Sequence, residues 1–374
     1  MTEWRKRCLG EITSFMSKGI PPKYVERENE NTVRVLNQKC NRNFEINYEE
    51  SRLHDCSKKK VPDDKMLRPG DVLINSTGTG TAGRVAQLYD VPTSTTIDGH
   101  MILLRPTEEI DSIYYGYAVK AFQTQIETLA EGSTGQTEIN RKRLQEEIVI
   151  SFPKEKETQD RIAHFLLNID EKIKVNNRIN KNLEQQAQAI YQQMFIENQN
   201  PNWKEGKLSD LVAVKYGKDH KKLDGGCYPV YGSGGIMRYV EKPLYTGESV
   251  LIPRKGTLNN VMYVNGAFWS VDTMFYTEML RPNIAKFVYH FVKGKDLASL
   301  NAGSAVPSMT TNILNAMPLY VPDDETLSIF EETVTPMYSQ MQENEKQSAN
   351  LANIRDTLLP RLMSGELEVS DIDL

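Results

Sequence analysis

The sequence predicts an α+β fold with two similar mixed α/β domains, separated by a pair of long antiparallel coiled-coil helices in a pseudo-two-fold internal repeat. Three observations support this prediction. The 374 residues exceed what one ordinary core holds. Apolar runs and turns recur in the same order in two parts of the chain, and a helical pattern follows each part. We expect domains over 1–154 and 201–322, a first spacer helix over 155–200, and a second spacer helix with a C-terminal tail over 323–374.

The two domains are predicted to share strands and turns because their apolar runs correspond. Residues 68–74 (RPGDVLI) and 80–88 (GTAGRVAQL) match residues 245–252 (YTGESVLI) and 256–264 (GTLNNVMYV). Each pair consists of an apolar run, a turn and a second, alternating run, which is typical of two connected strands. The correspondence therefore predicts the same strand–turn–strand unit in both domains.

A helical pattern follows each domain, and its apolar residues step by four and three, which is the spacing of a coiled-coil seam. Residues 157–197 would form a helix ~60 Å long at about 1.5 Å per residue. Pro336 and Pro360 predict kinks or breaks in the second helix. Two unrelated helices, each packed on its own domain, are the alternative. The seam positions are Ile162, Leu166, Ile169, Ile173, Asn176, Asn180, Leu183, Ala187, Ile190 and Met194, and, 168 residues later, Phe330, Val334, Met337, Met341, Asn344, Ser348, Leu351, Arg355, Leu358 and Leu362, of which only Arg355 departs in character.

A polar interruption falls at the same place in both seams. If the helices are antiparallel, Asn176 and Asn180 in the first face Asn344 and Ser348 in the second. A buried polar residue in a seam costs stability but fixes the register. We therefore predict that this layer sets the distance between the two domains, and that Asn176 and Asn344 do not point into solvent.

The composition is that of a globular protein of the cytoplasm. No apolar run reaches membrane-spanning length, and the first residues lack the apolar core of a signal peptide. The four cysteines include no C-x-x-C pair and the five histidines show no H-E-x-x-H spacing, so we expect free thiols and no metal site. The net charge of −5 is unevenly distributed: residues 201–322 carry 14 basic and 9 acidic side chains, whereas 323–374 carry 3 and 12. The middle of the chain could therefore hold a polyanion.

A glycine-rich loop, residues 76–84 (STGTGTAGR), has the letters of a dinucleotide-binding fingerprint, and Asp98 follows Gly78 by twenty residues. That fingerprint requires a helix after the glycines. Here a short alternating run ends at Pro92, and the matching segment of the second domain has a single glycine. The context favours a strand–turn–strand connection. Because phosphate-loop and nucleophile-elbow motifs are also missing from the sequence, we expect no catalytic residues.

The loops between the predicted strands carry small polar and basic groups at matching places in both domains. Arg and Lys side chains neutralise phosphates or reach guanine, Asn and Gln pair with adenine, and Thr contacts bases or the thymine methyl group. We therefore predict DNA contacts from these loops. The candidate residues are Lys18, Lys23, Thr79, Arg84, Asn140, Arg141, Lys142 and Arg143 in the first domain and Lys218, Lys221, Lys222, Ser233, Arg254, Lys255, Thr257, Asn259, Asn260 and Thr311 in the second.

Four stretches of the second half resemble the DNA-specificity subunits of type I restriction–modification systems: YPVYGSGG (228–235), IPRKGT (252–257), FWSVDT (268–273) and LLPRLMSGEL (358–367). The order domain, long helix, domain, long helix also matches that family over essentially the whole chain. Arg254 and Lys255 match the family's basic turn.

The resemblance implies a non-catalytic reader of double-stranded DNA, in which each domain recognises one half of a split site and the helices hold the gap. It also implies that the helices dock two methyltransferase (modification) subunits, and that motor–nuclease (restriction) subunits join this core. S-adenosylmethionine, ATP and Mg would then belong to the partner subunits. The alternatives are a scaffold whose repeated domains bind proteins without DNA specificity, and an enzyme that uses the 78–83 loop.

Overall fold

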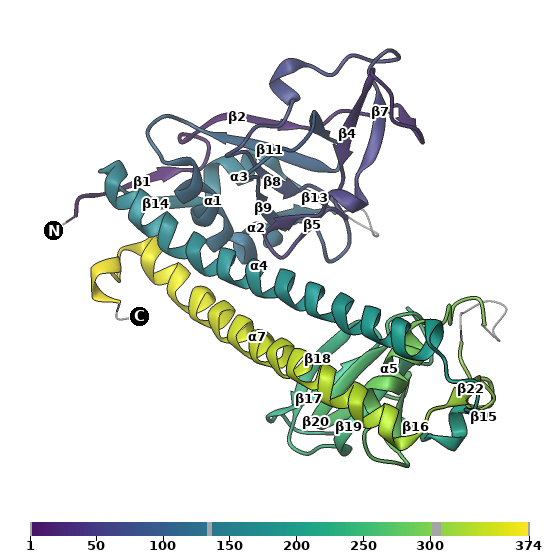
Figure 1. Cartoon of the computed structure of the whole chain (residues 1–374). Coiled ribbons are helices and arrows are strands. Elements are labelled where there is room, and N and C mark those ends of the chain that lie inside the picture. Colours follow the sequence, from purple (N-terminus) through teal and green to yellow (C-terminus); the bar gives the residue numbers. More distant parts are fainter. Residues whose placement is uncertain (1, 133–136, 301–307, 373–374) are drawn as a thin grey trace. The chain divides into compact units, whose positions relative to one another are not determined.

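A computed structural model describes residues 2–132, 137–300 and 308–372 (Figure 1). The chain divides into two compact units. Unit 1 comprises residues 1–175 and 346–374, and unit 2 comprises residues 176–345. The boundaries between the units fall inside two long helices, so each unit contains a strand-rich part and one segment of each helix.

Unit 1 is built on two four-stranded sheets, with orders β10-β4-β7-β3 and β2-β11-β8-β9. All strand pairs in these sheets are antiparallel except β10–β4. The strands are β1 (Trp4–Cys8), β2 (Thr13–Lys18), β3 (Tyr24–Val25), β4 (Thr32–Leu36), β5 (Asn41–Arg42), β6 (Glu45–Ile46), β7 (Arg52–Asp55), β8 (Val72–Asn75), β9 (Val85–Gln87), β10 (Thr95–Ile97), β11 (Met101–Pro106), β12 (Ala130–Glu131), β13 (Glu138–Ile139) and β14 (Val149–Pro153), and the helices are α1 (Ser112–Ala121), α2 (Gln123–Thr128) and α3 (Arg141–Glu147).

Unit 2 has one six-stranded mixed sheet of order β16-β21-β19-β20-β17-β18, in which only β17 and β20 run parallel. The strands are β15 (Lys204–Lys207), β16 (Val212–Tyr216), β17 (Tyr228–Gly232), β18 (Gly235–Val240), β19 (Tyr245–Pro253), β20 (Met262–Ser270), β21 (Met274–Met279) and β22 (Pro318–Val321), and the short helices are α5 (Ala285–Lys293) and α6 (Thr311–Asn315). In both units the first strand pairs antiparallel with the strand before the long helix, β1 with β14 and β15 with β22.

The long helices are α4 (Lys156–Gln192) and α7 (Asp324–Ser364). A π-helical turn continues α4 to Glu197, so the prediction of a helix over 157–197 is confirmed within one residue. Pro336 and Pro360 predict kinks or breaks in the second helix. A break is wrong, because α7 runs through both prolines, while a kink stays a prediction. A proline removes one helical hydrogen bond. In this helix, buried side chains on both sides of Pro336, Val334 and Tyr338, hold the backbone in place.

Both long helices contribute to the core of each unit. In unit 1, Ile162 and Leu166 of α4 and Leu362 of α7 pack in the same apolar cluster as the tyrosines of α1. In unit 2, Tyr191 of α4 packs against Phe330 of α7, with ring centroids 6.2 Å apart. Burial of these faces removes the seam residues from water, which is the main source of stability for a long amphipathic helix.

The polar interruption of the seam is buried in unit 2. Asn176 is 1% exposed and Asn344 is 6% exposed. The Asn344 amide donates to Asn180 Oδ1 over 2.8 Å, and the Asn180 amide donates to the carbonyl of Met341 over 3.1 Å. Ser348 is half-buried in the α7 segment of unit 1. The Asn176 amide donates to the carbonyl of Asn344 over 3.5 Å, so Asn176, Asn180 and Asn344 meet, and the role of the layer in setting the register stays a prediction.

In each unit a buried polar group links one short helix to both long helices; the short helix is α1 in unit 1 and α5 in unit 2. In unit 1, the Tyr117 hydroxyl of α1 donates to Asp170 of α4 over 2.6 Å, and Arg355 of α7 donates to the same carboxylate over 2.5 Å. Burial of both partners makes this an ion pair shielded from water. Arg355 departs from the apolar seam because it neutralises Asp170.

In unit 2, His290 of α5 has the corresponding place. Its Nε2 lies 2.9 Å from the hydroxyl of Tyr338 on α7, and its Nδ1 lies 2.7 Å from Gln188 Oε1 on α4. Tyr338 stands 168 residues after Asp170, the same offset that relates the two seams. The two units therefore anchor their helices at matching positions, one with an ion pair and the other with neutral hydrogen bonds.

Candidate nucleic-acid interface

A turn between β20 and β21, residues 271–273, holds three loops of unit 2 together. The backbone N–H groups of Arg254 and Lys255 donate to the carbonyl of Thr273 over 2.9 and 3.2 Å. The N–H of Val271 donates to the carbonyl of Tyr231 over 3.1 Å. Just before the turn, the carbonyl of Ser270 accepts from the backbone N–H of Lys218 over 2.8 Å. The turn thus positions the start of the 217–227 loop, the β17–β18 hairpin and the β19–β20 loop at one end of the sheet.

Arg254 is held in position by two contacts. Its guanidinium lies 5.3 Å from the ring centroid of Tyr216, a cation–π contact, and its Nη1 donates to the carbonyl of Asp272 over 3.3 Å. Tyr216 ends β16 and is 52% exposed. Both groups therefore present an ordered, solvent-accessible face, while the neighbouring Lys255 is exposed.

The β19–β20 loop is also tied to the β17–β18 hairpin. The Asn260 amide donates to the carbonyl of Ser233 over 2.7 Å. Gly256 approaches the same serine so closely that a Cβ on this glycine would lie 3.0 Å from the Ser233 hydroxyl oxygen. Asn259 instead bonds Asp296 and the N–H of Ala298. Asn259 and Asn260 therefore have structural partners. Ser233 lies at the contact between the β17–β18 hairpin and the β19–β20 loop. These two loops and the start of the 217–227 loop are together called the loop cluster.

The basic side chains of this surface form no ion pairs with described residues, although the backbone N–H of Lys221 donates to Asp219 Oδ1 over 3.1 Å. Among the residues that the structure describes, none of the side chains of Lys218, Lys221, Lys222, Arg254 and Lys255 forms an ion pair. An unpaired cluster of cations attracts a polyanion, and neutralising the phosphates of the polyanion favours binding. Thr257 is exposed in the same loop, and Thr311 is the first residue of α6.

The glycine-rich loop of unit 1 joins β8 to β9, which pair antiparallel, so the prediction of a strand–turn–strand connection is confirmed. Gly78, Gly80 and Gly83 all have positive φ, which explains the glycines without a ligand. The Arg84 guanidinium donates to the carbonyl of Gly80 over 3.0 Å, and Thr79 at the tip of the loop is exposed.

The loop lies beside the second predicted segment of unit 1. The N–H of Ile139 donates to the carbonyl of Ser76 over 2.8 Å, and Lys18 forms an ion pair with Glu138. The structure therefore brings Lys18, the 76–84 loop and the start of α3 together. Lys23 is exposed elsewhere, where its N–H donates to Nδ1 of His54 over 2.8 Å.

The members of the predicted cluster at 140–143 differ in the contacts that they make. Asn140 caps α3, since its side chain accepts from the N–H groups of Lys142 and Arg143. Arg143 pairs with Glu131 and Glu147, each at 2.6 Å. Arg141 and Lys142 are exposed, and Lys142 lies 3.9 Å from Glu146. Arg141 is therefore the member of the cluster most available to a ligand.

Residue patterns missed two parts of this surface, Tyr216 and the 271–273 turn. Tyr216 lies within the basic loop start KYGK, and its aromatic ring beside lysines was the available signal. The turn lies within FWSVDT, which contributed to the family resemblance but contains no basic residue. Its role became visible only through its backbone hydrogen bonds.

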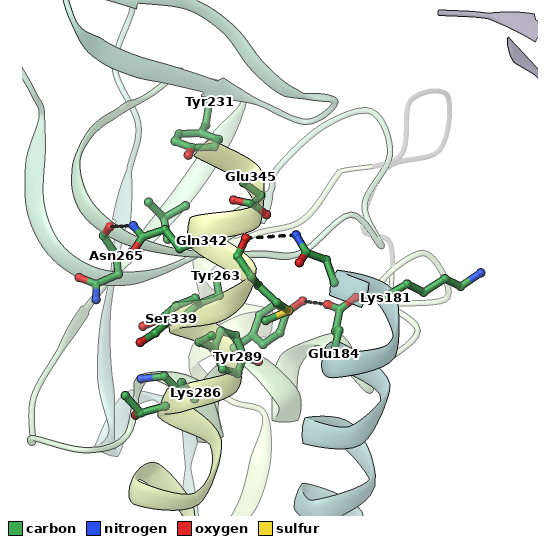
Figure 2. Close-up of a pocket in the computed structure, with 15 residues that line it drawn as sticks. Lys181, Glu184, Tyr231, Tyr263, Asn265, Lys286, Tyr289, Ser339, Gln342 and Glu345 are labelled. Carbon is green, nitrogen blue, oxygen red and sulfur yellow. Dashed lines mark hydrogen bonds between the residues drawn. The ribbon is translucent and has the colours of Figure 1, made fainter. Parts of the chain in front are cut away.

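A polar cavity of about 380 Å³ lies elsewhere in unit 2, between α7, α4, α5 and β20 (Figure 2). Its cation, Lys286, is 3% exposed and pairs with Glu248 at 3.0 Å and with Glu331. Glu184 accepts from Tyr289 and Lys293, while Lys181 points away from the cavity (Figure 2). Burial, and then the charge of Glu184, raises the pKa of the Glu345 carboxyl. The cavity is acidic and internally paired, so it is a poor site for phosphate.

Among the described residues, no group of three or more His, Cys, Asp or Glu side chains is placed to hold a metal ion. Within the same ranges, no helix has both the length and the apolarity needed to cross a membrane. The cysteines are free thiols, as predicted.

The sequence of the chain also matches the model of a known protein family. The model of the type I restriction modification DNA specificity domain matches residues 1–185 and 200–350. The chain belongs to this family. Membership in the DNA specificity family gives the chain a role in the recognition of DNA sequence and agrees with a basic loop surface.

Relatives in the DNA specificity family differ in the length that matches. The chain is 24% identical over 180 residues to the specificity subunit of the type I restriction enzyme HindI of Haemophilus influenzae, covering 48% of this chain and 34% of that protein. It is 21% identical over 373 residues to the MjaIX specificity subunit of Methanocaldococcus jannaschii, covering 88% and 83%. The type I S subunit of M. genitalium has the same fold, with a TM-score of 0.58, 20% identity, and coverage of 97% and 96%.

Proposed function

We propose that the chain is a non-catalytic, sequence-specific DNA-binding subunit that reads a bipartite target, one half with each unit. The observation that carries this proposal is the loop cluster of unit 2. Its five lysine and arginine side chains form no ion pairs among the described residues, and residues 270–273 order the backbones of Lys218, Arg254 and Lys255. Phosphate contacts would position the duplex, and the ordered loops would read base edges.

The two long helices would hold the two half-sites at a fixed spacing. The buried contact of Asn180 with Asn344 supports this role, because sliding one helix past the other would separate the two amides and leave them unsatisfied. The spacing would then appear as a fixed gap in the DNA target. The acidic second helix would face protein rather than phosphate.

The partners in this proposal are double-stranded DNA, two modification subunits and motor–nuclease restriction subunits in the cytoplasm. The modification subunits would supply S-adenosylmethionine and flip the target adenine. The restriction subunits would supply the ATP- and Mg-dependent steps. The residues of this chain would contribute position and sequence preference.

Co-expression with the methyltransferase partner, followed by methylome sequencing, tests the proposal. A DNA-reading subunit gives methylation at one sequence with two fixed halves and a constant gap, and the methylation disappears when this chain is omitted. A protein-binding scaffold gives methylation that does not depend on this chain. Titration of the isolated chain with NAD or S-adenosylmethionine addresses the loop-enzyme alternative, which requires saturable binding.

A further inference from the structure

The edge strand β18 contains one residue more than its partner requires. Val230 of β17 pairs with Arg238, but the next residue, Tyr231, pairs with Ile236. Met237 therefore has no partner across the ladder and is the extra residue of a β-bulge. Such bulges turn a side chain away from the regular alternation of a strand and are frequent beside functional sites.

The bulge exposes an apolar side chain. Met237 is 60% exposed, the highest value among the large apolar side chains of the described residues. Its sulfur packs over Gly232, where an added Cβ would lie 2.5 Å from it. The glycine therefore leaves room for the thioether against the hairpin. Met237 contributes nothing to the core of unit 2. Ile236 and Tyr239 of the same strand are each 50% exposed, so β18 presents several apolar side chains to solvent rather than a single one.

Met237 belongs to the loop cluster described above. Gly232 is followed by Ser233, whose carbonyl accepts from Asn260 and whose hydroxyl lies under Gly256. Val271 of the central turn also lies beside Gly232, 3.8 Å from the position of its added Cβ. The thioether therefore stands next to the 271–273 turn, to which the backbone N–H groups of Arg254 and Lys255 donate.

The surroundings favour DNA as the occupant. Segment 201–322 has five more basic than acidic residues, and Arg254 and Lys255 form no ion pair with a described residue. A polyanion satisfies these cations, whereas an apolar protein surface would leave them desolvated. In the major groove, the apolar group that a base presents is the thymine 5-methyl group.

We propose that Met237 contacts a thymine methyl group in the half-site read by unit 2 and so selects thymine at one position. This inference rests on the proposed function and assigns a specificity role to a residue without charge or hydrogen-bonding capacity. The flexible, polarisable thioether suits contact with a methyl group. Arg254 and Lys255 position the backbone, and Met237 reads the base.

The test uses the assembled complex of the full chain with its methyltransferase subunits and the target found by methylome sequencing. Met237→Ala is compared with Leu280→Ala. Leu280 is 57% exposed and follows the opposite end of β21 from the 271–273 turn, so it is a matched exposed apolar control. We expect Met237→Ala to weaken binding about fivefold, as for loss of one small apolar contact, and Leu280→Ala to leave it unchanged.

Replacing each thymine of the target by deoxyuridine removes only the methyl group. At one position of one half-site, this replacement should weaken binding of the wild-type complex and leave binding of Met237→Ala unchanged. Met237→Leu should keep the sensitivity to the methyl group, since it keeps an apolar side chain. Thermal unfolding of each variant identifies any loss that is due to misfolding, and the Leu variant still tests the proposal if the Ala variant unfolds.

Three results overturn the inference: equal binding of the Met237 and Leu280 variants, a half-site without thymine, or a loss in Met237→Ala that does not depend on any thymine methyl. The last result would indicate a wedge between base pairs. If the complex methylates no fixed sequence, the proposed function itself fails. If a bipartite sequence is methylated and the Met237 variant binds normally, only this inference fails.

Discussion

Lowering the pH from about 7.5 to about 5 is expected to destabilise unit 2 through His290. The imidazole is fully buried and bonds Gln188 and Tyr338. Because the Gln188 oxygen accepts from Nδ1, Nε2 is the unprotonated nitrogen and accepts from the Tyr338 hydroxyl. Burial lowers the pKa of His290 from 6.5 to about 4, and the nearby carboxylate of Glu184 only partly opposes this effect.

The direction of the effect follows from proton binding. The unfolded chain protonates His290 below pH 6.5, whereas folded unit 2 keeps the ring neutral until about pH 4. The stabilising contribution is therefore present above pH 6.5 and is lost as the pH falls toward 4. At 1.36 kcal/mol per pKa unit, the loss is about 2 kcal/mol at pH 5 and about 3 kcal/mol near pH 4.

Denaturant unfolding followed by tryptophan fluorescence measures this loss. The chain has three tryptophans, of which Trp203 and Trp269 lie in unit 2 and are buried. A Trp4→Phe background therefore restricts the signal to unit 2. His290→Gln in the same background keeps a hydrogen-bonding side chain but cannot titrate. The difference between the two proteins cancels the titration of all other groups.

We expect the free energy of unfolding to fall by about 2 kcal/mol more in the His290 protein than in His290→Gln between the two pH values. An equal loss in both proteins would refute the reasoning, because it would show that His290 titrates alike in the folded and unfolded states. A larger loss in His290→Gln would contradict the sign.

Three further predictions concern the remaining anchors and loops. Arg355→Ala leaves the buried carboxylate of Asp170 without its cation and should cost unit 1 roughly 3–5 kcal/mol in denaturant unfolding, whereas Arg361→Ala breaks only an exposed pair and should change little. Gly365→Ala should cost roughly 1–2 kcal/mol in the same assay, since this glycine has φ +76°; wild-type stability would show that the left-handed turn after α7 is dispensable. Arg254→Ala should weaken DNA binding by the complex and lower its salt slope by about one, and an unchanged slope would remove this residue from the phosphate contacts.

The long helices and the glycine loop were predictable from the sequence because both depend on local pattern. The four–three spacing of α4 extends over the whole helix, and the run after Gly83 is too short and alternating for a helix. The expected break at Pro336 failed because packing over many turns compensates for one missing hydrogen bond. Local rules therefore predicted which segments form helices, and tertiary packing decided where the second helix continues.

The candidate interface was less predictable because its details depend on pairing register. A single-residue bulge decides which way Met237 points, and no residue pattern in β18 specifies it. The sequence likewise places Arg143 in a basic cluster but does not indicate that Glu131, twelve residues earlier, pairs with it. The sequence showed that Arg355 is a charged residue at an apolar seam position. It did not indicate the partner, because Asp170 lies 185 residues away.

The division of unit 1 into two stretches of chain affects the order in which it can fold during synthesis. Residues 1–175 leave the ribosome before all of unit 2, and the apolar residues of α7 that complete their core, Leu359 and Leu362, follow only afterwards. At a synthesis rate of about 5–20 residues per second, the nascent first unit waits roughly 10–40 s with part of its core uncovered. Unit 2 is continuous and can close without delay. During that interval, newly made chains would be most exposed to chaperones and proteases through unit 1.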